Sequence, residues 1–309
     1  MTLTTMSCLN SPPICIMPKD FADYLSCQQR YCLFLDIDGT LAEFTVDPKE
    51  SVIPSSTLTI LQDISSCGIA ITAVTGRSLN EARQMLSPLQ IPIAATHGLE
   101  IAFDGTTDNN KKSTAVDIGQ LLAIKKSVTQ SCLPFHELTI ETKPYSIALH
   151  YRQNPSLKDI AYDIMEEVLK NSPNWQLKQG KYVWELVPKG ADKGTAILTL
   201  LKKIPDSAMI CPIFIGDDIT DEAGFIAVQN NYNFIDEVNT DKAVKGIGIK
   251  VGNEASCADF YVNDIQEVTL LLKSFLSFCQ KQNDLFDDIQ HADYTNTNAD
   301  LNKNARPII

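Results

Sequence analysis

Three short apolar segments constrain the fold more than any other feature of this chain. They are Tyr31–Leu35, Ile69–Val74 and Met209–Ile215. An apolar run without alternation is typical of a strand that is buried on both faces, as in a parallel sheet covered by helices. Helices predicted at 58–65, 79–86 and 192–201 separate such runs, and Ser78 with Glu81 forms a candidate capping box at the start of the second helix. The alternation of strand and helix favours an α/β fold with a Rossmann-like parallel sheet.

Each of these strands is followed directly by polar residues. The clusters are Asp36-Ile37-Asp38-Gly39-Thr40, Thr75-Gly76-Arg77 and Gly216-Asp217-Asp218. Ligands of open parallel sheets bind at the carboxyl ends of the strands. We therefore expect the three clusters to meet at one edge of the sheet, with Lys193 at the start of a nearby helix.

The middle of the chain has a different texture. The polar segment 104–110 is a candidate linker, and a helix (about 116–130), two strands (about 135–142 and 146–152), a helix with Ser156 as its cap and two further strands follow it. This pattern predicts a small α+β domain inserted into the first one. The predicted organisation is a flexible arm (1–20), a first core segment (21–107), a cap domain (108–187), a second core segment (188–280) and a disordered tail (281–309).

Composition excludes several classes of partner. The formal net charge is -12 over 309 residues, whereas nucleic acids and anionic membranes require a basic surface. No uncharged apolar run reaches the roughly 18 residues of a membrane span. The nine cysteines contain no Cys-x-x-Cys pair and the start lacks the features of a secretory signal, so we expect reduced thiols in a cytoplasmic protein.

Clustered carboxylates suggest a metal. They repel one another and are costly to bury unpaired, and Mg²⁺ prefers oxygen ligands. A bound Mg²⁺ together with Lys193 and Thr75 could hold a phosphate group in an acidic protein. Each piece also has a plain alternative: an Asp-x-Asp is usually a solvated turn, Lys193 could be a solvated helix residue, and Thr75 could merely end a strand. The coincidence of the clusters at one sheet edge favours the functional interpretation.

The clusters together resemble the four signature motifs of the haloacid-dehalogenase superfamily. The further segments 149–152, 180–186, 192–196 and 216–222 resemble trehalose-6-phosphate phosphatases. The resemblance covers about residues 30–275. It implies a magnesium-dependent phosphatase, a phosphoric monoester hydrolase, that performs the final step of trehalose biosynthesis with trehalose 6-phosphate as substrate.

The resemblance also implies roles for individual residues. Asp36 would be the nucleophile, and Asp38 the proton carrier. The metal ligands would be Asp36, the main-chain carbonyl of Asp38, and Asp217, with Asp218 and Asp221 orienting them. Thr75 and Lys193 would bind phosphate, whereas Arg77 could contact it or be structural.

In the cap, the resemblance implies that Glu141, Lys143 and Glu185 read the sugar hydroxyls. Glu141 and Lys143 share one face of a strand, so a solvated salt-bridge row is the alternative. His150 and Arg152 would support the cap, and His97 would be structural. We expect a monomer with functional coupling to a trehalose-6-phosphate synthase. The alternatives are a capped phosphatase for another sugar phosphate and a non-catalytic regulatory protein.

Overall fold

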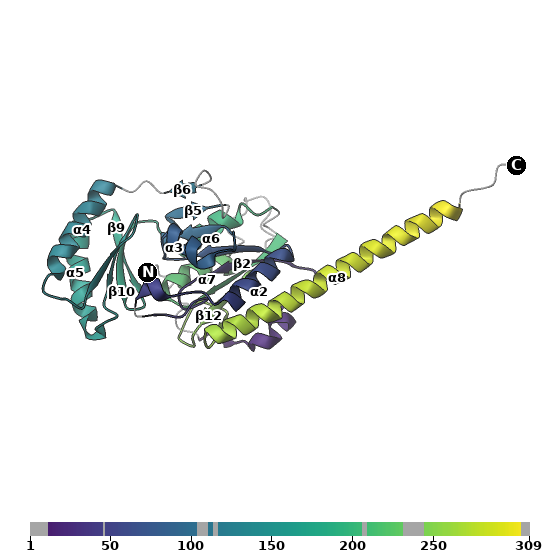
Figure 1. Cartoon of the computed structure of the whole chain (residues 1–309), viewed down its shortest axis with the longest axis horizontal. Coiled ribbons are helices and arrows are strands. Elements are labelled where there is room, and N and C mark those ends of the chain that lie inside the picture. Colours follow the sequence, from purple (N-terminus) through teal and green to yellow (C-terminus); the bar gives the residue numbers. More distant parts are fainter. Residues whose placement is uncertain are drawn as a thin grey trace.

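The computed structural model of the chain describes residues 12–45, 47–103, 111–113, 117–205, 209–230 and 244–303. Figure 1 shows a larger α/β unit beside a smaller one that carries α4 (Ile118–Cys132) and α5 (Lys158–Lys170). The larger unit is a mainly parallel sheet covered by helices, and the smaller unit is an antiparallel sheet backed by helices. The predicted fold class, an α/β core with an inserted α+β cap, is confirmed.

The core sheet has the order β1-β13-β12-β11-β2-β3-β4-β5-β6 within the described residues. Its strands are β1 (Ile14–Cys15), β2 (Arg30–Leu35), β3 (Ala70–Val74), β4 (Ile93–Ala95), β5 (Glu100–Ala102), β6 (Lys111–Ser113), β11 (Ile210–Gly216), β12 (Ile247–Val251) and β13 (Phe260–Val262). Neighbours from β1 to β4 in this order are parallel, and β4, β5 and β6 pair antiparallel. Because β2 lies between β11 and β3, the order of connection reverses beside β2, which is where ligands bind in such folds.

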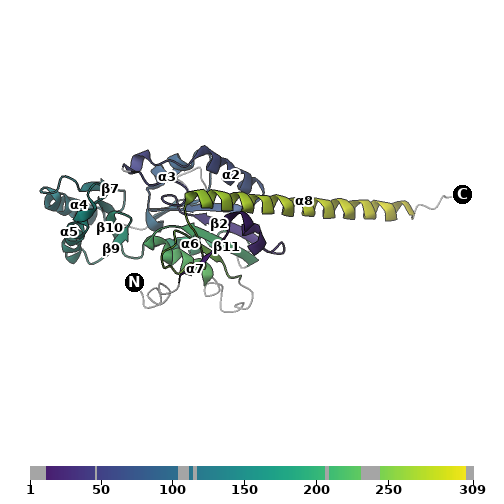
Figure 2. The same ribbon diagram turned by 90° about the horizontal axis from the view of Figure 1, so that it is seen from below.

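Helices cover both faces of the core sheet. Figure 2 shows α2 (Ser55–Ser66) and α3 (Leu79–Leu86) on one side of the sheet and α6 (Lys193–Leu201) and α7 (Glu222–Gln229) on the other. The helix α8 (Ile265–Lys303) packs with α2. Both faces of β2 are therefore buried: Leu33 and Leu35 join the α2 side, and Phe34 joins the α6 side. This two-sided burial explains the unbroken apolar run in the sequence.

The cap sheet has the order β7-β8-β10-β9, and all its pairs are antiparallel. Its strands are β7 (Thr139–Thr142), β8 (Ile147–His150), β9 (Trp175–Gly180) and β10 (Val183–Pro188). One face buries Leu149 and Leu186 against the helices, where they meet Met165 of α5. The alternate residues, such as Glu185, lie on the other face, which is turned toward the core.

Both predicted terminal segments differ from the structure. Within 1–20, residues 1–11 lie outside the described residues, but Ile14–Cys15 pair with β13, and a 3₁₀ helix follows at Pro18–Tyr24. The buried side chains of Ile16 and Phe21 explain why this segment is structured, because they join the core cluster that includes α8. The segment 281–309 was predicted to be disordered, yet α8 continues to Lys303. No Gly or Pro lies in this helix to end it, so low apolar content alone was a poor guide.

Two local predictions also need correction. The cap was predicted to begin at residue 108, but Lys111–Ser113 pair with β5 and extend the core sheet; the predicted linker 104–110 lies outside the described residues. Ser156 does not cap α5. Instead the side chain of Asn154 accepts the Ser156 amide at 3.2 Å and caps a short 3₁₀ helix that precedes α5. None of the described helices combines the length and the apolarity that a membrane span requires.

Candidate active site

The loop after β2 positions the central carboxylate. The Asp36 amide donates to Ile215 of β11 at 3.0 Å, which extends the strand pairing to the edge of the sheet. The chain then makes a tight turn in which the Gly39 amide donates to Ala42. Gly39 has φ +80, and a Cβ there would lie 2.1 Å from Oδ2 of Asp217. Only glycine permits both this conformation and this close approach of the two loops.

Lys193 forms ion pairs with two carboxylates of the site. Its ammonium lies 2.9 Å from Asp36 and 2.7 Å from Asp221, and it is 2% exposed. Burial opposes the charged form of Lys193, but the charges of Asp221 and Asp36 outweigh it and raise the pKa of the ammonium. The same burial raises the pKa of Asp36 to about 8, against the effect of Lys193. The acid motifs predicted from separate strands therefore meet as expected.

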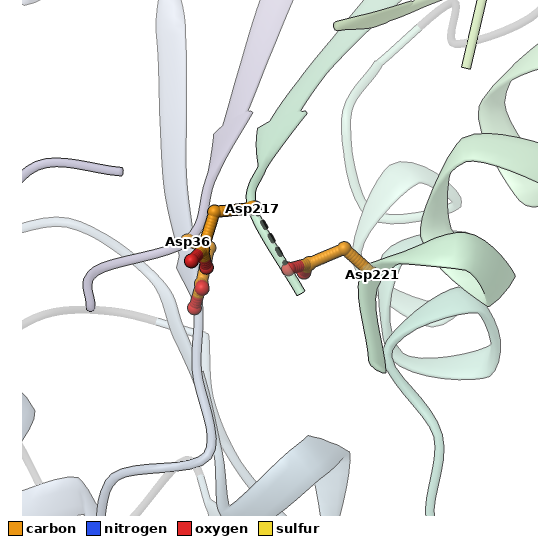
Figure 3. Close-up of side chains that lie close together, drawn as sticks. All are labelled: Asp36, Asp217 and Asp221. Carbon is orange, nitrogen blue, oxygen red and sulfur yellow. Dashed lines mark hydrogen bonds between the residues drawn. The ribbon is translucent and has the colours of Figure 1, made fainter. Parts of the chain in front are cut away.

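Asp217 and Asp221 complete the acidic cluster (Figure 3). Carboxylate oxygens of Asp36, Asp217 and Asp221 lie within 4.8 Å of one another. Asp221 is bound by protein donors: one oxygen accepts from Lys193, and the other accepts the amides of Asp217 at 3.1 Å and Asp218 at 3.0 Å. These bonds suit the orienting role implied for Asp221 better than a role as ligand. Burial, with the charges of Asp36 and Asp221, raises the pKa of Asp217 well above its usual range.

Asp38 and Thr75 line the same cleft as this acidic cluster. Arg77 holds the Asp38 carboxylate with two bonds, Nε to Oδ2 at 2.7 Å and Nη2 to Oδ1 at 2.5 Å. The Thr75 hydroxyl is buried and accepts the Arg77 amide at 3.1 Å. The capping box of Ser78 and Glu81 at the start of α3 is present as predicted and fixes this loop. Arg77 was expected either to contact phosphate or to be structural. In the structure its guanidinium binds Asp38, the residue expected to carry the proton.

The cap contributes a buried network around Glu185. Its carboxylate accepts from the Ser146 hydroxyl at 2.5 Å and lies 3.2 Å from the Lys143 ammonium and 3.1 Å from His97 Nε2. Lys143 also donates to the main-chain carbonyl of Gly76 in the core at 2.9 Å. Although burial opposes it, these partners lower the pKa of Glu185, and burial lowers the pKa of His97 to about 4. His97 thus joins the core to the cap residues expected to read the sugar.

Glu141 lies at the other end of the cap face. Its carboxylate is 2.8 Å from His150 Nε2. Burial opposes ionisation, but this bond and the charge of Lys143 lower the pKa of Glu141. The side chain of Arg152 donates to the Thr45 carbonyl of the core and stands 5.3 Å from the Phe44 ring. Both His150 and Arg152 also line the cleft, so their role as supports of the cap stays a prediction.

A single cleft between core and cap contains all eight predicted site residues. It encloses about 760 Å³ of empty space, open solvent included. The eight residues are Asp36, Asp38, Thr75, Glu141, Lys143, Glu185, Lys193 and Asp217. Their placement agrees with the prediction, and their individual roles stay predictions.

Residues 34–266 match the family model described as trehalose-phosphatase, which spans well over half of the chain. The chain belongs to this family. It is 30% identical over 266 residues to trehalose-6-phosphate phosphatase from Escherichia coli (strain K12), an alignment that covers 84% of this chain and 93% of that protein. It is 36% identical over 230 residues to a probable trehalose-phosphate phosphatase from Sinorhizobium fredii (strain NBRC 101917 / NGR234), covering 72% and 85% of the two chains.

A solved structure agrees with the fold. The C-terminal domain of trehalose-6-phosphate phosphatase from C. albicans superposes with a TM-score of 0.73 at 20% identity, covering 86% of this chain and 98% of that one. Family membership confirms the resemblance stated from the motifs and the predicted enzyme class, a phosphoric monoester hydrolase.

The acidic cluster fits the divalent cation that the family implies. Three carboxylates meet there, and among the described residues Lys193 is the ammonium that pairs with them. Oδ1 of Asp217 is buried without a hydrogen-bond partner among those residues. A buried, unpaired carboxylate oxygen is costly, and oxygen is the ligand that Mg²⁺ prefers. The contribution of the Asp38 carbonyl stays a prediction.

Several residues of the cleft were not predicted from the sequence. Lys178 and Lys181 of the β9–β10 hairpin line it, as does Phe44, over whose ring the Lys181 ammonium lies at 4.4 Å. The Lys181 amide also donates to Asp218 of the core at 3.1 Å. Strand alternation was the available signal for Lys178, because it is directly opposite Glu185 on β10.

Proposed function

We propose that this chain hydrolyses trehalose 6-phosphate to trehalose and phosphate through an aspartyl-phosphate on Asp36. The observation that carries the proposal is the cleft, where a carboxylate held by Lys193 on the core faces a charged surface on the cap. The relatives are named for phosphorylated trehalose, which supports this choice of sugar.

The residues divide the reaction into two displacements. Asp36 attacks phosphorus, and the bond from phosphorus to the sugar oxygen breaks while Asp38 protonates that oxygen. Asp38 then removes a proton from the water that attacks the aspartyl-phosphate, which releases phosphate and restores Asp36. Lys193 and Thr75 hold phosphate oxygens during both steps. Mg²⁺ held by Asp36, Asp217 and the Asp38 carbonyl would neutralise charge on the phosphoryl group.

The cap residues supply sugar selectivity. Glu141, Lys143 and Glu185 would bond the hydroxyls of the disaccharide, which offers almost no apolar surface. A site built for hydroxyls discriminates strongly, because a wrong sugar leaves buried polar groups unpaired. The bonds of Lys143 to Gly76 and of His97 to Glu185 hold the cap on the core, an arrangement that excludes water from the phosphoryl group.

The test is phosphate release from trehalose 6-phosphate, sucrose 6-phosphate and glucose 6-phosphate, each with and without Mg²⁺. We expect the highest kcat/KM with trehalose 6-phosphate and loss of turnover when Mg²⁺ is chelated. Preference for another sugar would replace this substrate by that of a related capped phosphatase. Absence of turnover with every sugar would favour the non-catalytic regulatory alternative.

Functional coupling to a trehalose-6-phosphate synthase, a monomeric state and a cytoplasmic location remain predictions from the sequence. The coupling follows from the chemistry of the substrate, since a synthase must supply it. An enzyme with the proposed activity would act directly after that step.

A further inference from the structure

Lys178 is a charged residue of the cleft that the proposed mechanism does not use. It lies on β9 of the cap and is partly buried. Among the described residues, no hydrogen bond or ion pair involves its ammonium, whereas Lys143 and Lys193 in the same cleft each pair with carboxylates. An ammonium that lines a cleft and has no acceptor in the described part of the chain keeps its donors available to a ligand bound there.

The register of the cap sheet places Lys178 among the residues expected to read the sugar. Glu141 is opposite Ala148, Ala148 is opposite Glu185, and Glu185 is opposite Lys178. These four residues therefore form one row across β7, β8, β10 and β9 with their side chains on the same face. Three steps between strands span about 14 Å, which is comparable to the length of a disaccharide phosphate.

Three members of this row line the cleft. They are Glu141, Glu185 and Lys178, whereas Ala148 is fully buried beneath it. The helices α4 and α5 pack on the opposite face. The carboxylates of Glu141 and Glu185 already have protein partners, so Lys178 is the member of the row whose donors no described residue engages, and a sugar hydroxyl can accept from it.

We propose that Lys178 is a substrate-binding residue that donates a hydrogen bond to the sugar portion of the phosphorylated disaccharide. The Glu185 carboxylate does not satisfy the Lys178 ammonium, because Ser146, Lys143 and His97 already surround that carboxylate. Asp192 also acts on the ammonium, but its carboxylate caps α6 through bonds to Thr195. This inference rests on the proposed function and extends it by one specificity-determining residue.

The first test compares Lys178→Met with wild type in the Mg²⁺-loaded full chain. We expect kcat/KM for trehalose 6-phosphate to fall about tenfold or more, as for loss of a charged hydrogen bond. The inhibition constant of inorganic phosphate should change less than about twofold. Lys170→Met, which removes an exposed cap lysine, is the matched control and should leave both values unchanged.

The second test uses charge and does not depend on the methionine variant. Burial lowers the pKa of Lys178 to about 8, against the charges of Asp192 and Glu185; the core groups Lys193 and Asp221 also act on it. Arginine stays protonated throughout this range. We therefore expect the ratio of the KM of wild type to that of Lys178→Arg to rise between about pH 7 and 9.

The outcomes separate this inference from the proposed function. If wild type does not hydrolyse trehalose 6-phosphate, the proposed function fails and the inference fails with it. If wild type does hydrolyse it and Lys178→Met retains kcat/KM, or the KM ratio is independent of pH, only the inference fails. If Lys178→Met weakens inhibition by inorganic phosphate as much as it lowers kcat/KM, the ammonium binds the phosphate group, and the assignment to the sugar is overturned.

Discussion

At the residue scale, His97 illustrates how a buried group can serve the cleft indirectly. It has φ 55, it lies against Gly76, and its Nε2 is 3.1 Å from the Glu185 carboxylate. Burial lowers its pKa to about 4, so the neutral ring donates one hydrogen bond at pH 7. The sequence predicted a structural role for His97, and the contact gives that role a specific target.

The depressed pKa of His97 has a consequence for stability. The unfolded chain binds a proton at His97 below about pH 6.5, whereas the native state does so below about pH 4, so stability falls as the pH falls between them. We expect His97 to contribute a loss of about 2 kcal/mol between about pH 7.5 and 5. Urea unfolding of wild type and His97→Asn measures it; asparagine tolerates positive φ. Equal pH dependence of the two proteins would contradict the expectation.

The sequence could predict which core residues meet in the site, because these residues directly follow apolar strands. Asp36, Thr75 and Asp217 needed only the rule that carboxyl ends of parallel strands meet. The partners of Glu185 could not be found in this way. Ser146 and His97 lie 39 and 88 residues from it. The contact of Ser146 depends on strand pairing within the cap, and that of His97 depends on how the cap sits on the core; no local sequence pattern predicts either.

At the element scale, the residues that begin a helix distinguish the correct predictions from the wrong ones. The capping box of Ser78 and Glu81 was predicted correctly, because both residues precede an amphipathic stretch at the required spacing. The same pattern was misleading at Ser156. There Pro155 begins a 3₁₀ turn, and Asn154, which precedes the proline, becomes the cap. Helix α3 follows the Thr75–Arg77 loop directly, so its correct start also positions a portion of the site.

These two serines provide a matched pair of substitutions. Ser78→Ala removes the side-chain cap, because the Ser78 hydroxyl that accepts the Glu81 amide is lost while the main-chain bond to the Glu81 carboxylate remains, and we expect the free energy of unfolding to fall by about 1 kcal/mol. Ser156→Ala removes an exposed hydroxyl that, among the residues the structure describes, bonds to Asn154 alone, and should change the free energy of unfolding by less than about 0.5 kcal/mol. Urea denaturation measures both. A larger effect at Ser156 than at Ser78 would show that the assignment of caps is wrong.

At the scale of the whole molecule, the insertion of one domain into the other creates the site. The predicted reaction chemistry lies on the core and sugar recognition on the cap, and the cleft joins them. The alternation of strands and helices predicted both layers, since each helix and strand buries one local pattern. The outer strands β1, β5, β6 and β13 were harder to predict, because each has only two or three residues and therefore little periodicity. In addition, β1 pairs with β13, which is distant in the sequence.

The long helix α8 divides into two sections along its length. Its apolar residues from Val268 to Cys279 pack in the core cluster, and the rest of the helix projects beyond the core (Figures 1 and 2). A chain that ends at Asp284 should therefore keep kcat/KM within about twofold and its melting temperature within a few degrees. A chain that ends at Lys273 loses Phe275 and Phe278 and should lose several kcal/mol of stability.

Thermal unfolding and phosphate release compare the two shortened chains. Loss of turnover in the longer one, without loss of stability, would mean that the distal section of α8 contributes to the reaction. Retained stability in the shorter one would contradict the packing of the two phenylalanines.

The central claim is that Asp36 carries the phosphoryl group between the two displacements. The most direct measurement is rapid acid quenching of the Mg²⁺-loaded enzyme during turnover of trehalose 6-phosphate labelled in its phosphate, followed by peptide mass spectrometry. We predict label on the peptide that contains Asp36 and none with Asp36→Asn, which should still bind substrate but not turn it over. Turnover by Asp36→Asn, or label on a different residue of the wild type, would contradict the claim.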